Sequence, residues 1–296
     1  MAHISVLQEE VLRYLDPKPN EYFIDCTLGN GGHAFAILGK TAPRGKLLGI
    51  DWDPDAIARA RTEAKQKGCA GRLILANDSY ANLAEIIRQE KFPQPHGILL
   101  DLGLSSEQLE ESKRGFTFRK QEPLDMRFNP GHSLTAEKVL NFWSRQDIEK
   151  IIKEYGGEQF AKEIAGAIIE QRTKKPLAKT SDLVDAVLEA IPKRWHRAKI
   201  HPATRTFQAL RIAVNGELEN IKRVLPQAVE TLKPGGKIAV ISFHSLEDKI
   251  VKEFFKEQTN VRILTKKPTV PAIKEIQHNP RARSAKLRAA EKLQTI

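Results

Sequence analysis

Between a short apolar run and a segment of helical periodicity, the chain has the sequence Asp25-Cys-Thr-Leu-Gly-Asn-Gly-Gly-His33. Three glycines within four positions let the backbone turn sharply and let a ligand approach it closely. The helix that follows would present its unbonded N-terminal N–H groups to that ligand. The stretch therefore predicts a strand, a glycine-rich loop and a helix that together hold a small molecule.

An acid in the next predicted strand narrows the kind of ligand. Asp51 ends an apolar run and lies 22 positions after Gly29, a distance at which an acid can accept hydrogen bonds from ribose hydroxyls. Because Gly29-x-Gly31-x-x-Ala34 also satisfies the dinucleotide pattern, a nicotinamide-dependent oxidoreductase remains an alternative. Asp25 favours instead a ligand with an ammonium group. A tight turn without any ligand would need the same glycines.

Strand-like and helix-like segments alternate over the first hundred residues. Apolar runs bounded by Gly, Pro, Asp or Asn predict strands at Tyr22–Cys26, Lys46–Ile50, Arg72–Ala76 and Gly97–Asp101. Between the second and third of these runs, and between the third and fourth, helices are predicted at Asp55–Lys67 and Tyr80–Lys91. This alternation predicts an α/β, Rossmann-like fold with a mainly parallel sheet and right-handed crossovers.

The alternation stops after Asp101. From about Ser105 to about His201 the sequence predicts no strand, but helices at Arg145–Tyr155, Gln159–Gln171 and Ser181–Ala190. A long helix, Phe207–Leu232, and the strands Lys237–Phe243 and Val261–Thr265 then precede a basic tail. The predicted organisation is a core of residues 1–104 and 205–296, interrupted by a helical insertion, residues 105–204.

The charge of the chain is uneven. Residues 1–110 hold 12 basic and 15 acidic residues, whereas the remainder holds 36 and 22. Two segments are especially basic: Arg172–Arg211 carries 10 basic and 3 acidic residues, and Arg262–Ile296 carries 9 and 2. This asymmetry suggests that one part handles a small molecule and the other meets a polyanion such as nucleic acid. Ordinary solvated faces of a basic protein would give the same counts.

Several other classes of protein are not indicated. No stretch approaches the roughly 20 apolar residues of a membrane span, so no membrane partner is predicted. Cys26 and Cys69 form no CxxC pair, which argues against a disulfide scaffold and fits a reducing, cytoplasmic setting. The eight histidines show no ligand spacing, so no metal site is predicted.

Eight segments, in order, carry a resemblance to a known family. The first recognised is Gly97-Ile-Leu-Leu-Asp-Leu-Gly-Leu-Ser-Ser-Glu-Gln-Leu109. The chain resembles the MraW (RsmH) family of ribosomal small-subunit rRNA cytosine-N4 methyltransferases over nearly its whole length. The other segments are His3–Leu7, the Gly29–His33 loop, Arg114–Phe118, Pro123–Arg127, His201–Gln208, Ile241–Asp248 and Asn279–Arg283. Asn30 and Tyr80 depart from the commonest residues of the family, which are Arg and Phe.

The resemblance implies a fold, a cofactor and a target. The fold is a class I methyltransferase domain that carries a helical insertion. The target is the exocyclic N4 of a decoding-centre cytidine in 16S rRNA of the small ribosomal subunit, and the helical insertion, residues 105–204, would recognise the RNA. The sequence leaves the oligomeric state open between a monomer and a homodimer. S-adenosylmethionine, with S-adenosylhomocysteine as product, would be bound at Gly31, Gly32, His33, Asp51, Tyr80, Asp101 and Gln108.

Asp101 is the candidate catalytic residue, with two roles open. Cytosine N4 is a poor nucleophile because its lone pair is delocalised, and a carboxylate that accepts the amino hydrogens would localise that pair. Amino methyltransferases often have an acid, two prolines and an aromatic here, but Asp101-Leu-Gly-Leu-Ser105 keeps only the acid. Asp101 therefore either orients the amino group or only binds the cofactor.

The substrate side is predicted from aromatic, basic and histidine residues. Phe116, Phe118 and Phe128 lie among arginines, a pattern that suits an extruded base and its phosphates, but these rings could equally form the core of the insertion. Substrate contacts are predicted at Arg127, Arg205 and His244. A third hypothesis is an RNA-binding ribosome assembly factor with a vestigial cofactor pocket.

Overall fold

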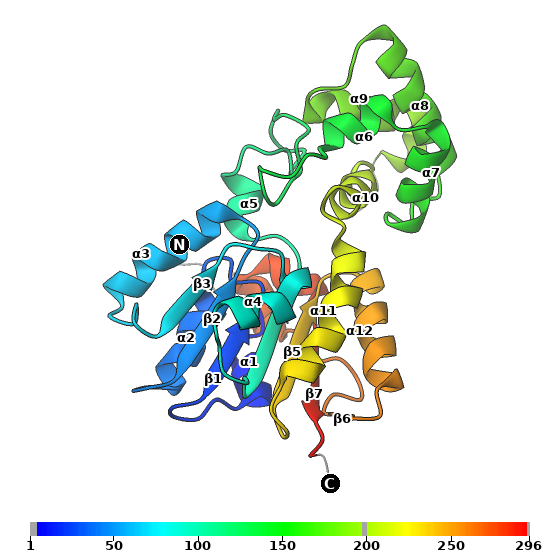
Figure 1. Cartoon of the computed structure of the whole chain (residues 1–296). Helices are drawn as coiled ribbons and strands as arrows, with labels where there is room; N and C mark the ends of the chain where they lie inside the picture. Colours follow the sequence, from blue (N-terminus) through cyan, green and yellow to red (C-terminus); the bar gives the residue numbers. More distant parts are fainter. Residues whose placement is uncertain (1–4, 197–199, 295–296) are drawn as a thin grey trace. The chain divides into compact units, whose positions relative to one another are not determined.

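The computed structural model describes residues 5–196 and 200–294, so His3 of the N-terminal segment quoted above lies outside the described residues. The chain divides into two compact units. The α/β unit comprises Met1–Gly103 and Leu218–Ile296, and the helical unit comprises Leu104–Glu217 (Figure 1). None of the described helices is long and apolar enough to cross a membrane.

The α/β unit contains one seven-stranded sheet, in the order β3-β2-β1-β4-β5-β7-β6. The first five strands in this order are parallel, and β7 pairs antiparallel with both β5 and β6. The predicted Rossmann-like, mainly parallel sheet is therefore confirmed. The strands are β1 (Tyr22–Asp25), β2 (Lys46–Ile50), β3 (Leu73–Ala76), β4 (Gly97–Asp101), β5 (Lys237–Ser242), β6 (Val261–Ile263) and β7 (Lys286–Lys292).

Helices cover both faces of this sheet (Figure 1). Successive residues of a strand point to opposite faces, so Phe23 packs in one core cluster and Ile24 in the other. The first cluster takes in α1 (Gln8–Leu15), α2 (Gly32–Lys40) and α3 (Pro54–Gln66). The second takes in α4 (Leu83–Gln89), α11 (Glu217–Thr231) and α12 (Ser245–Glu257). A short helix, α13 (Ile273–His278), precedes β7.

The predicted basic tail contains a strand that the sequence analysis missed. Leu287–Ala290 of β7 are buried between β5 and β6, including the side chain of Arg288. That guanidinium donates from Nε to Oδ1 of Asp248 at 2.6 Å, which compensates its buried charge. The charged residues of β7 hide the apolar pattern of a strand, and this is why composition alone predicted a tail.

The helical unit has its own hydrophobic core. In the part of this unit that the structure describes, the only β pairing is a single bridge between Pro123 and Lys179. The three predicted helices are present as α7, α8 and α9. The helices of the unit are α5 (Ser106–Glu110), α6 (Ala136–Phe142), α7 (Arg145–Glu154), α8 (Ala161–Lys174), α9 (Thr180–Ala190) and α10 (Thr204–Asn215).

The predicted helix Phe207–Leu232 is two helices. Gly216 adopts a left-handed conformation, with φ of 60°, and ends α10 before α11 begins. The buried side chains of α10, among them Phe207 and Leu210, pack into the core of the helical unit. The boundary predicted between residues 204 and 205 therefore moves to between Glu217 and Leu218, because α10 buries its apolar face in the insertion.

Asn215 should be a stability determinant of the helical unit. Its amide donates to the carbonyls of Met126 and Arg211 and accepts from the N–H of Phe128, all within 2.9 Å. Asn215→Ala leaves buried backbone groups unpaired, so we expect the free energy of unfolding to fall by about 2–3 kcal/mol. Urea unfolding followed by the fluorescence of Trp143 and Trp195, both in this unit, measures the change.

Gln146 is the control for this variant, because it is exposed on α7 of the same unit. Gln146→Ala should change the free energy of unfolding by less than about 0.5 kcal/mol. An equally small effect of Asn215→Ala would mean that the loop from Met126 to Phe128 does not depend on this amide.

Candidate active site

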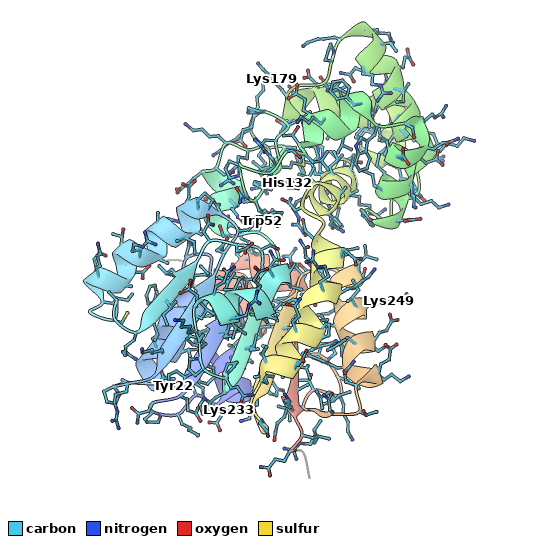
Figure 2. The ribbon with its side chains drawn as sticks, viewed as in Figure 1. Tyr22, Trp52, His132, Lys179, Lys233 and Lys249 are labelled. Carbon is cyan, nitrogen blue, oxygen red and sulfur yellow. The ribbon has the colours of Figure 1, made fainter. Side chains whose placement is uncertain are left out.

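Three acidic side chains meet at the carboxyl ends of neighbouring parallel strands. Asp25, Asp51 and Asp101 end or directly follow β1, β2 and β4, which lie side by side in the sheet. Figure 2 shows Trp52, the residue after Asp51, at the opposite end of the sheet from Tyr22, where β1 begins. Ligands of open α/β sheets bind at this carboxyl edge.

The glycine-rich loop after β1 is tied to the end of β2. The N–H of Gly29 donates to Oδ2 of Asp51 at 2.7 Å, and Oδ1 accepts from the N–H of Asp53 at 2.8 Å. Gly31 has φ of 75°, and a Cβ there would lie 2.5 Å from the ring of Phe35. Only glycine therefore fits at Gly31, and one role of Asp51 is to fix the loop.

Gly32 begins α2 under the N-terminal segment of the chain. A Cβ on Gly32 would lie 2.0 Å from Oγ of Ser5, so the segment before α1 packs directly on this residue. Gln8 adds a hydrogen bond from its side-chain amide to the carbonyl of Gly32 at 3.1 Å. These contacts hold the start of α2 in place beside the predicted cofactor loop.

Burial raises the pKa of two of the three acids. Asp25 is 1% exposed, and burial raises its pKa to about 6. Burial also raises the pKa of Asp51 to about 6, although the hydrogen bonds from Asp53 and Gly29 oppose this. Two carboxyl groups that are costly to ionise favour a ligand that brings positive charge to this edge of the sheet.

Thr27 links two of the acids and was missed in the sequence analysis. Its N–H donates to Oδ1 of Asp25 at 3.1 Å, and its hydroxyl accepts from the N–H of Asp101 at 2.6 Å. The spacing Asp-x-Thr was the available signal, because short polar side chains often bond to backbone two residues away. The hydroxyl of Thr27 thus joins the ends of β1 and β4.

His33 lies on α2 beside Asp101. Its Nε2 is 3.6 Å from Oδ2 of Asp101, and the residue is 6% exposed. Burial disfavours the charged imidazole, but the charges of Asp101, Asp25 and Glu275 raise the pKa of His33 above its ordinary value. Within residues 5–196 and 200–294, neither ring nitrogen of His33 has a hydrogen-bond partner, nor has Oδ1 of Asp101.

Tyr80 begins a short 3₁₀ helix, Tyr80–Asn82, after β3. Ser79 caps this helix through the N–H of Ala81, and Asp78 accepts from the side chain of Asn82 at 3.0 Å. The ring of Tyr80 is partly buried against the second core cluster. The helix-cap interpretation of this segment is thus correct, and contact of Tyr80 with an adenine stays a prediction.

Three of the predicted site residues lie in the helical unit, namely Gln108, Arg127 and Arg205. Gln108 is buried and forms a capping box with Ser105 at the start of α5. Arg127 pairs with Asp125 through Nε at 2.8 Å and Nη2 at 2.7 Å, and donates to two loop carbonyls. Its guanidinium therefore braces its own loop.

Arg205 has a looser environment than Arg127. Its Nη1 lies 3.6 Å from Oε2 of Glu158, and its side chain is 49% exposed. It lines a pocket of about 230 Å³ in the helical unit, together with aromatic side chains that include Phe160 and Trp195. Contact of Arg205 with the substrate remains a prediction that this exposure allows.

The phenylalanines of the insertion pack against neighbouring rings. Phe116 is buried and stacks on Phe128, with ring centroids 5.8 Å apart. Phe118 stacks on His201 at 4.5 Å and meets Phe207 edge-on at 5.3 Å. The core interpretation of these rings is therefore correct, which leaves base stacking untested.

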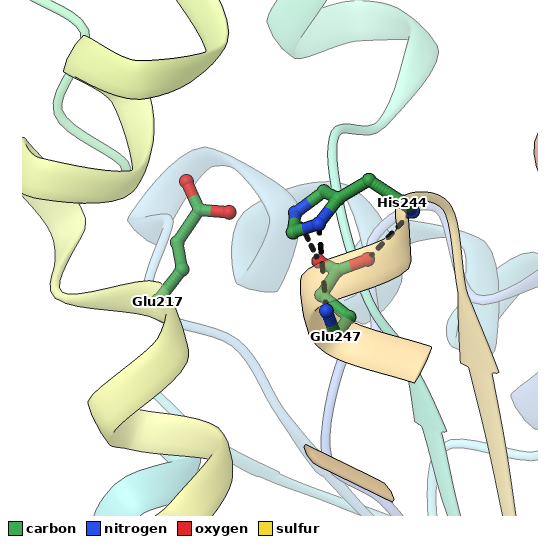
Figure 3. Close-up of side chains that lie close together, drawn as sticks. All are labelled: Glu217, His244 and Glu247. Carbon is green, nitrogen blue, oxygen red and sulfur yellow. Dashed lines mark hydrogen bonds and ion pairs between the residues drawn. The ribbon is translucent and has the colours of Figure 1, made fainter. Parts of the chain in front are cut away.

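His244 caps the helix that follows β5. Its Nδ1 accepts from the N–H of Glu247, and its Nε2 lies 3.2 Å from Oε1 of the same residue (Figure 3). Oε2 of Glu247 accepts from the N–H groups of Phe243 and His244. Glu247 is 1% exposed and was missed, although His244-x-x-Glu247 has the spacing of a capping box.

The structure brings together only part of the predicted site within the α/β unit. His33, Asp51 and Asp101 meet at the carboxyl edge of the sheet with the glycine loop between them. Asp101 and Ile241 are register partners of β4 and β5, and His244 lies three residues after Ile241, just beyond the end of the neighbouring strand. The α/β unit therefore presents a glycine loop, three acids and two histidines at one edge.

The chain is similar to known proteins over nearly its whole length. The chain matches the MraW methylase family over residues 1–293. Proteins named ribosomal RNA small subunit methyltransferase H are similar to it over nearly all of both chains. One from Heliobacterium mobile is 45% identical over 310 residues, 98% of this chain and 99% of its own length. One from Trichlorobacter lovleyi is 46% identical over 309 residues, 98% of each chain.

Solved structures are similar at lower identity. A putative rRNA methylase from Clostridium thermocellum is 16% identical, with a TM-score of 0.48 over 99% of this chain and 100% of its own. A putative methyltransferase from Streptococcus mutans, in complex with SAH, is 14% identical, with a TM-score of 0.47 over 98% of this chain and 100% of its own.

Asp25→Asn should change the pH dependence of stability. Burial raises the pKa of Asp25 from the ordinary 3.8 to about 6. The native state therefore binds the proton more tightly than the unfolded chain, and the free energy of unfolding falls as the pH rises through this range. Without ligand, the free energy of unfolding of Asp25→Asn should exceed that of the wild type by about 1–3 kcal/mol near pH 8. Near pH 4 the two values should differ little.

Urea unfolding at these two pH values measures the difference. Asp185→Asn is the control, because Asp185 is exposed on α9. This control should unfold like the wild type at both pH values. A loss of stability in Asp25→Asn near pH 8 would show that the carboxylate stabilises the ligand-free protein, contrary to the effect of burial.

Proposed function

The chain belongs to the MraW methylase family, and from this premise we propose that it methylates the exocyclic N4 of a decoding-centre cytidine in 16S rRNA. The methyl donor is S-adenosylmethionine, and the RNA is part of the small ribosomal subunit in a cytoplasmic setting. The observation that carries the proposal is the whole-length similarity to proteins named ribosomal RNA small subunit methyltransferase H. A nicotinamide oxidoreductase, the alternative from the glycine pattern, is excluded by this family.

The edge of the sheet fits S-adenosylmethionine by its chemistry. The ligand carries a positive sulfonium and an ammonium group, and the raised pKa values of Asp25 and Asp51 mark a place where positive charge is favoured. Gly31 and Gly32 would let the cofactor approach the backbone closely, and Asp51 would accept hydrogen bonds from the ribose hydroxyls. Bound here, the cofactor supplies a methyl group that is already activated for transfer.

Asp101 is proposed to act on the target amino group. Oδ1 of Asp101 is buried and has no hydrogen-bond partner in the part of the chain that the structure describes. Such an oxygen can accept a hydrogen bond from the amino group of cytosine and so localise the nitrogen lone pair. The second candidate role, binding the cofactor alone, would leave the same oxygen for the ammonium group.

The helical unit is proposed to hold the RNA. The segment from Lys174 to Arg194 exposes several basic side chains, namely Lys174, Lys175, Lys193 and Arg194. Exposed cations attract phosphates without reading the sequence, and Trp195, 42% exposed, offers a ring for stacking. The basic residues of the C-terminal segment, including Lys266 and Lys267, are exposed as well.

The first test identifies the methylated nucleoside that the reaction produces. Small subunits from a strain that lacks this activity are incubated with the protein and S-adenosylmethionine, and their nucleosides are analysed by mass spectrometry. We expect N4-methylcytidine, reduced by at least about 100-fold with Asp101→Ala because the amino group loses its acceptor. Asp185→Ala, an exposed acid of α9, should leave the yield unchanged.

Each other outcome supports a different function. A methyl group on another atom would keep the cofactor and refute the N4 assignment. RNA binding without any transfer, to intact subunits or to naked RNA, would favour an RNA-binding ribosome assembly factor, a function that the basic segments also support.

RNA affinity should depend strongly on salt. Neutralised phosphates release counterions, so the logarithm of the affinity should fall linearly with the logarithm of the salt concentration between about 50 and 200 mM. Lys193→Ala combined with Arg194→Ala should reduce that slope by about one to two. Filter binding with a small-subunit rRNA fragment measures both slopes.

Lys249→Ala is the matched control, because Lys249 is exposed on α12 of the α/β unit (Figure 2). Its slope should equal that of the wild type. An affinity that stays constant over the salt range would refute the electrostatic binding of RNA.

A further inference from the structure

His33 is a buried polar residue whose side chain is not explained by local structure. It occupies the first turn of α2, where a local hydrogen bond to the helix start would satisfy it. Among the described residues no such bond is present, and both ring nitrogens are buried without a hydrogen-bond partner. An apolar side chain would fill this position without that desolvation cost, so the imidazole is expected to have a function.

Acidic groups face His33 from three elements. Asp101 comes from the end of β4, Asp25 from the end of β1 and Glu275 from α13. Glu275 also accepts the N–H of Leu7 at 2.8 Å and so belongs to the wall formed by the N-terminal segment. A cation surrounded by three acids is stabilised, and it lowers the repulsion among them.

The contact between His33 and Asp101 is specific to one oxygen. Nε2 lies 3.6 Å from Oδ2, within ion-pair distance but longer than a hydrogen bond. Contacts of this kind are often long without substrate and shorten in the complex. The other oxygen, Oδ1, is buried and has no hydrogen-bond partner among the described residues, so the carboxylate has one oxygen toward the histidine and one acceptor that is unsatisfied.

We propose that His33 is a positioning residue: its imidazolium holds Oδ2 of Asp101 and leaves Oδ1 to receive the amino group of the target base. This inference rests on the proposed function, because it assigns Asp101 to the base. The proposed role belongs to the side chain of His33 alone. The backbone of Gly31–His33 would approach the cofactor independently of that side chain. His33 touches neither the base nor the methyl group in this role.

The pair of His33 and Asp101 would also handle the proton that the methylated amino group loses. The N4 lone pair forms a bond to the methyl carbon while the carbon–sulfur bond breaks and its electrons remain on sulfur. The amino nitrogen is then cationic and must lose one proton. Asp101 accepts that proton on Oδ1 and passes it to water after the product leaves. The imidazolium keeps Asp101 ionised and oriented beforehand, and its own proton stays on the ring.

The first experiment measures the pair without any turnover. Histidines labelled with ¹³C are titrated by NMR in the whole chain, and the signal of His33 is identified by its loss in His33→Gln. We expect the pKa of His33 to lie above its ordinary value and to fall in Asp101→Asn. His96, at the opposite end of β4, is the internal control, and its titration should not change in Asp101→Asn.

The second experiment separates binding from chemistry. His33→Gln should lower kcat for small-subunit methylation by about 10–100-fold, the usual effect of losing a supporting partner. The dissociation constant for S-adenosylmethionine should change less than about threefold, because the backbone contacts remain. In the wild type, kcat should fall at high pH as the imidazolium deprotonates, and this fall should be absent in His33→Gln. His96→Gln should behave like the wild type.

The outcomes distinguish this inference from the function on which it rests. If N4-methylcytidine forms but the titration of His33 does not respond to Asp101→Asn, the positioning role is refuted and the function stands. If cofactor affinity and kcat fall together in His33→Gln, the side chain is a cofactor contact instead. If the methyl group appears on another atom while the titration responds as expected, the pair is real and the proposed function is refuted.

Discussion

The burial of carboxylates at one edge of a parallel sheet is the constraint on which the rest of the structure depends. Asp25 and Asp51 are held there by backbone N–H groups of Thr27, Gly29 and Asp53, yet burial still raises the pKa of both to about 6. Those hydrogen bonds fix the glycine loop, so the same interactions that accommodate the charge also shape the ligand site.

Short apolar runs predicted the core strands and failed where charged side chains interrupted them. The first four strands were predicted within one residue, whereas the packing of Phe23 and Ile24 in different core clusters became visible only in the structure. β7 was missed because its lysines and Arg288 look like a solvated tail, and only Asp248, 40 positions away, makes that arginine a core residue. Gly216 divides two helices whose apolar faces belong to different cores. No local pattern reveals which core each face joins.

The predicted cofactor residues of the α/β unit lie together, but their contacts with a ligand stay a prediction. The loop glycines, Asp51 and Asp101 all lie at the carboxyl edge of the sheet. His244, expected on the substrate side, caps its own helix through Glu247. Arg127, expected there as well, braces its own loop through Asp125. These partners lie two or three positions away, so the local signal was present, but the same pattern also suits a ligand contact.

The insertion between β4 and β5 fixes the order in which the protein can fold during its synthesis. β5 pairs with β4 only after the whole of Leu104–Glu217 has been made. At about 5–20 residues per second, β4 waits on the order of ten seconds as an open sheet edge. The helices of the insertion make mostly local contacts and can form meanwhile. The nascent chain therefore completes its helical unit before it completes the sheet that carries the acids.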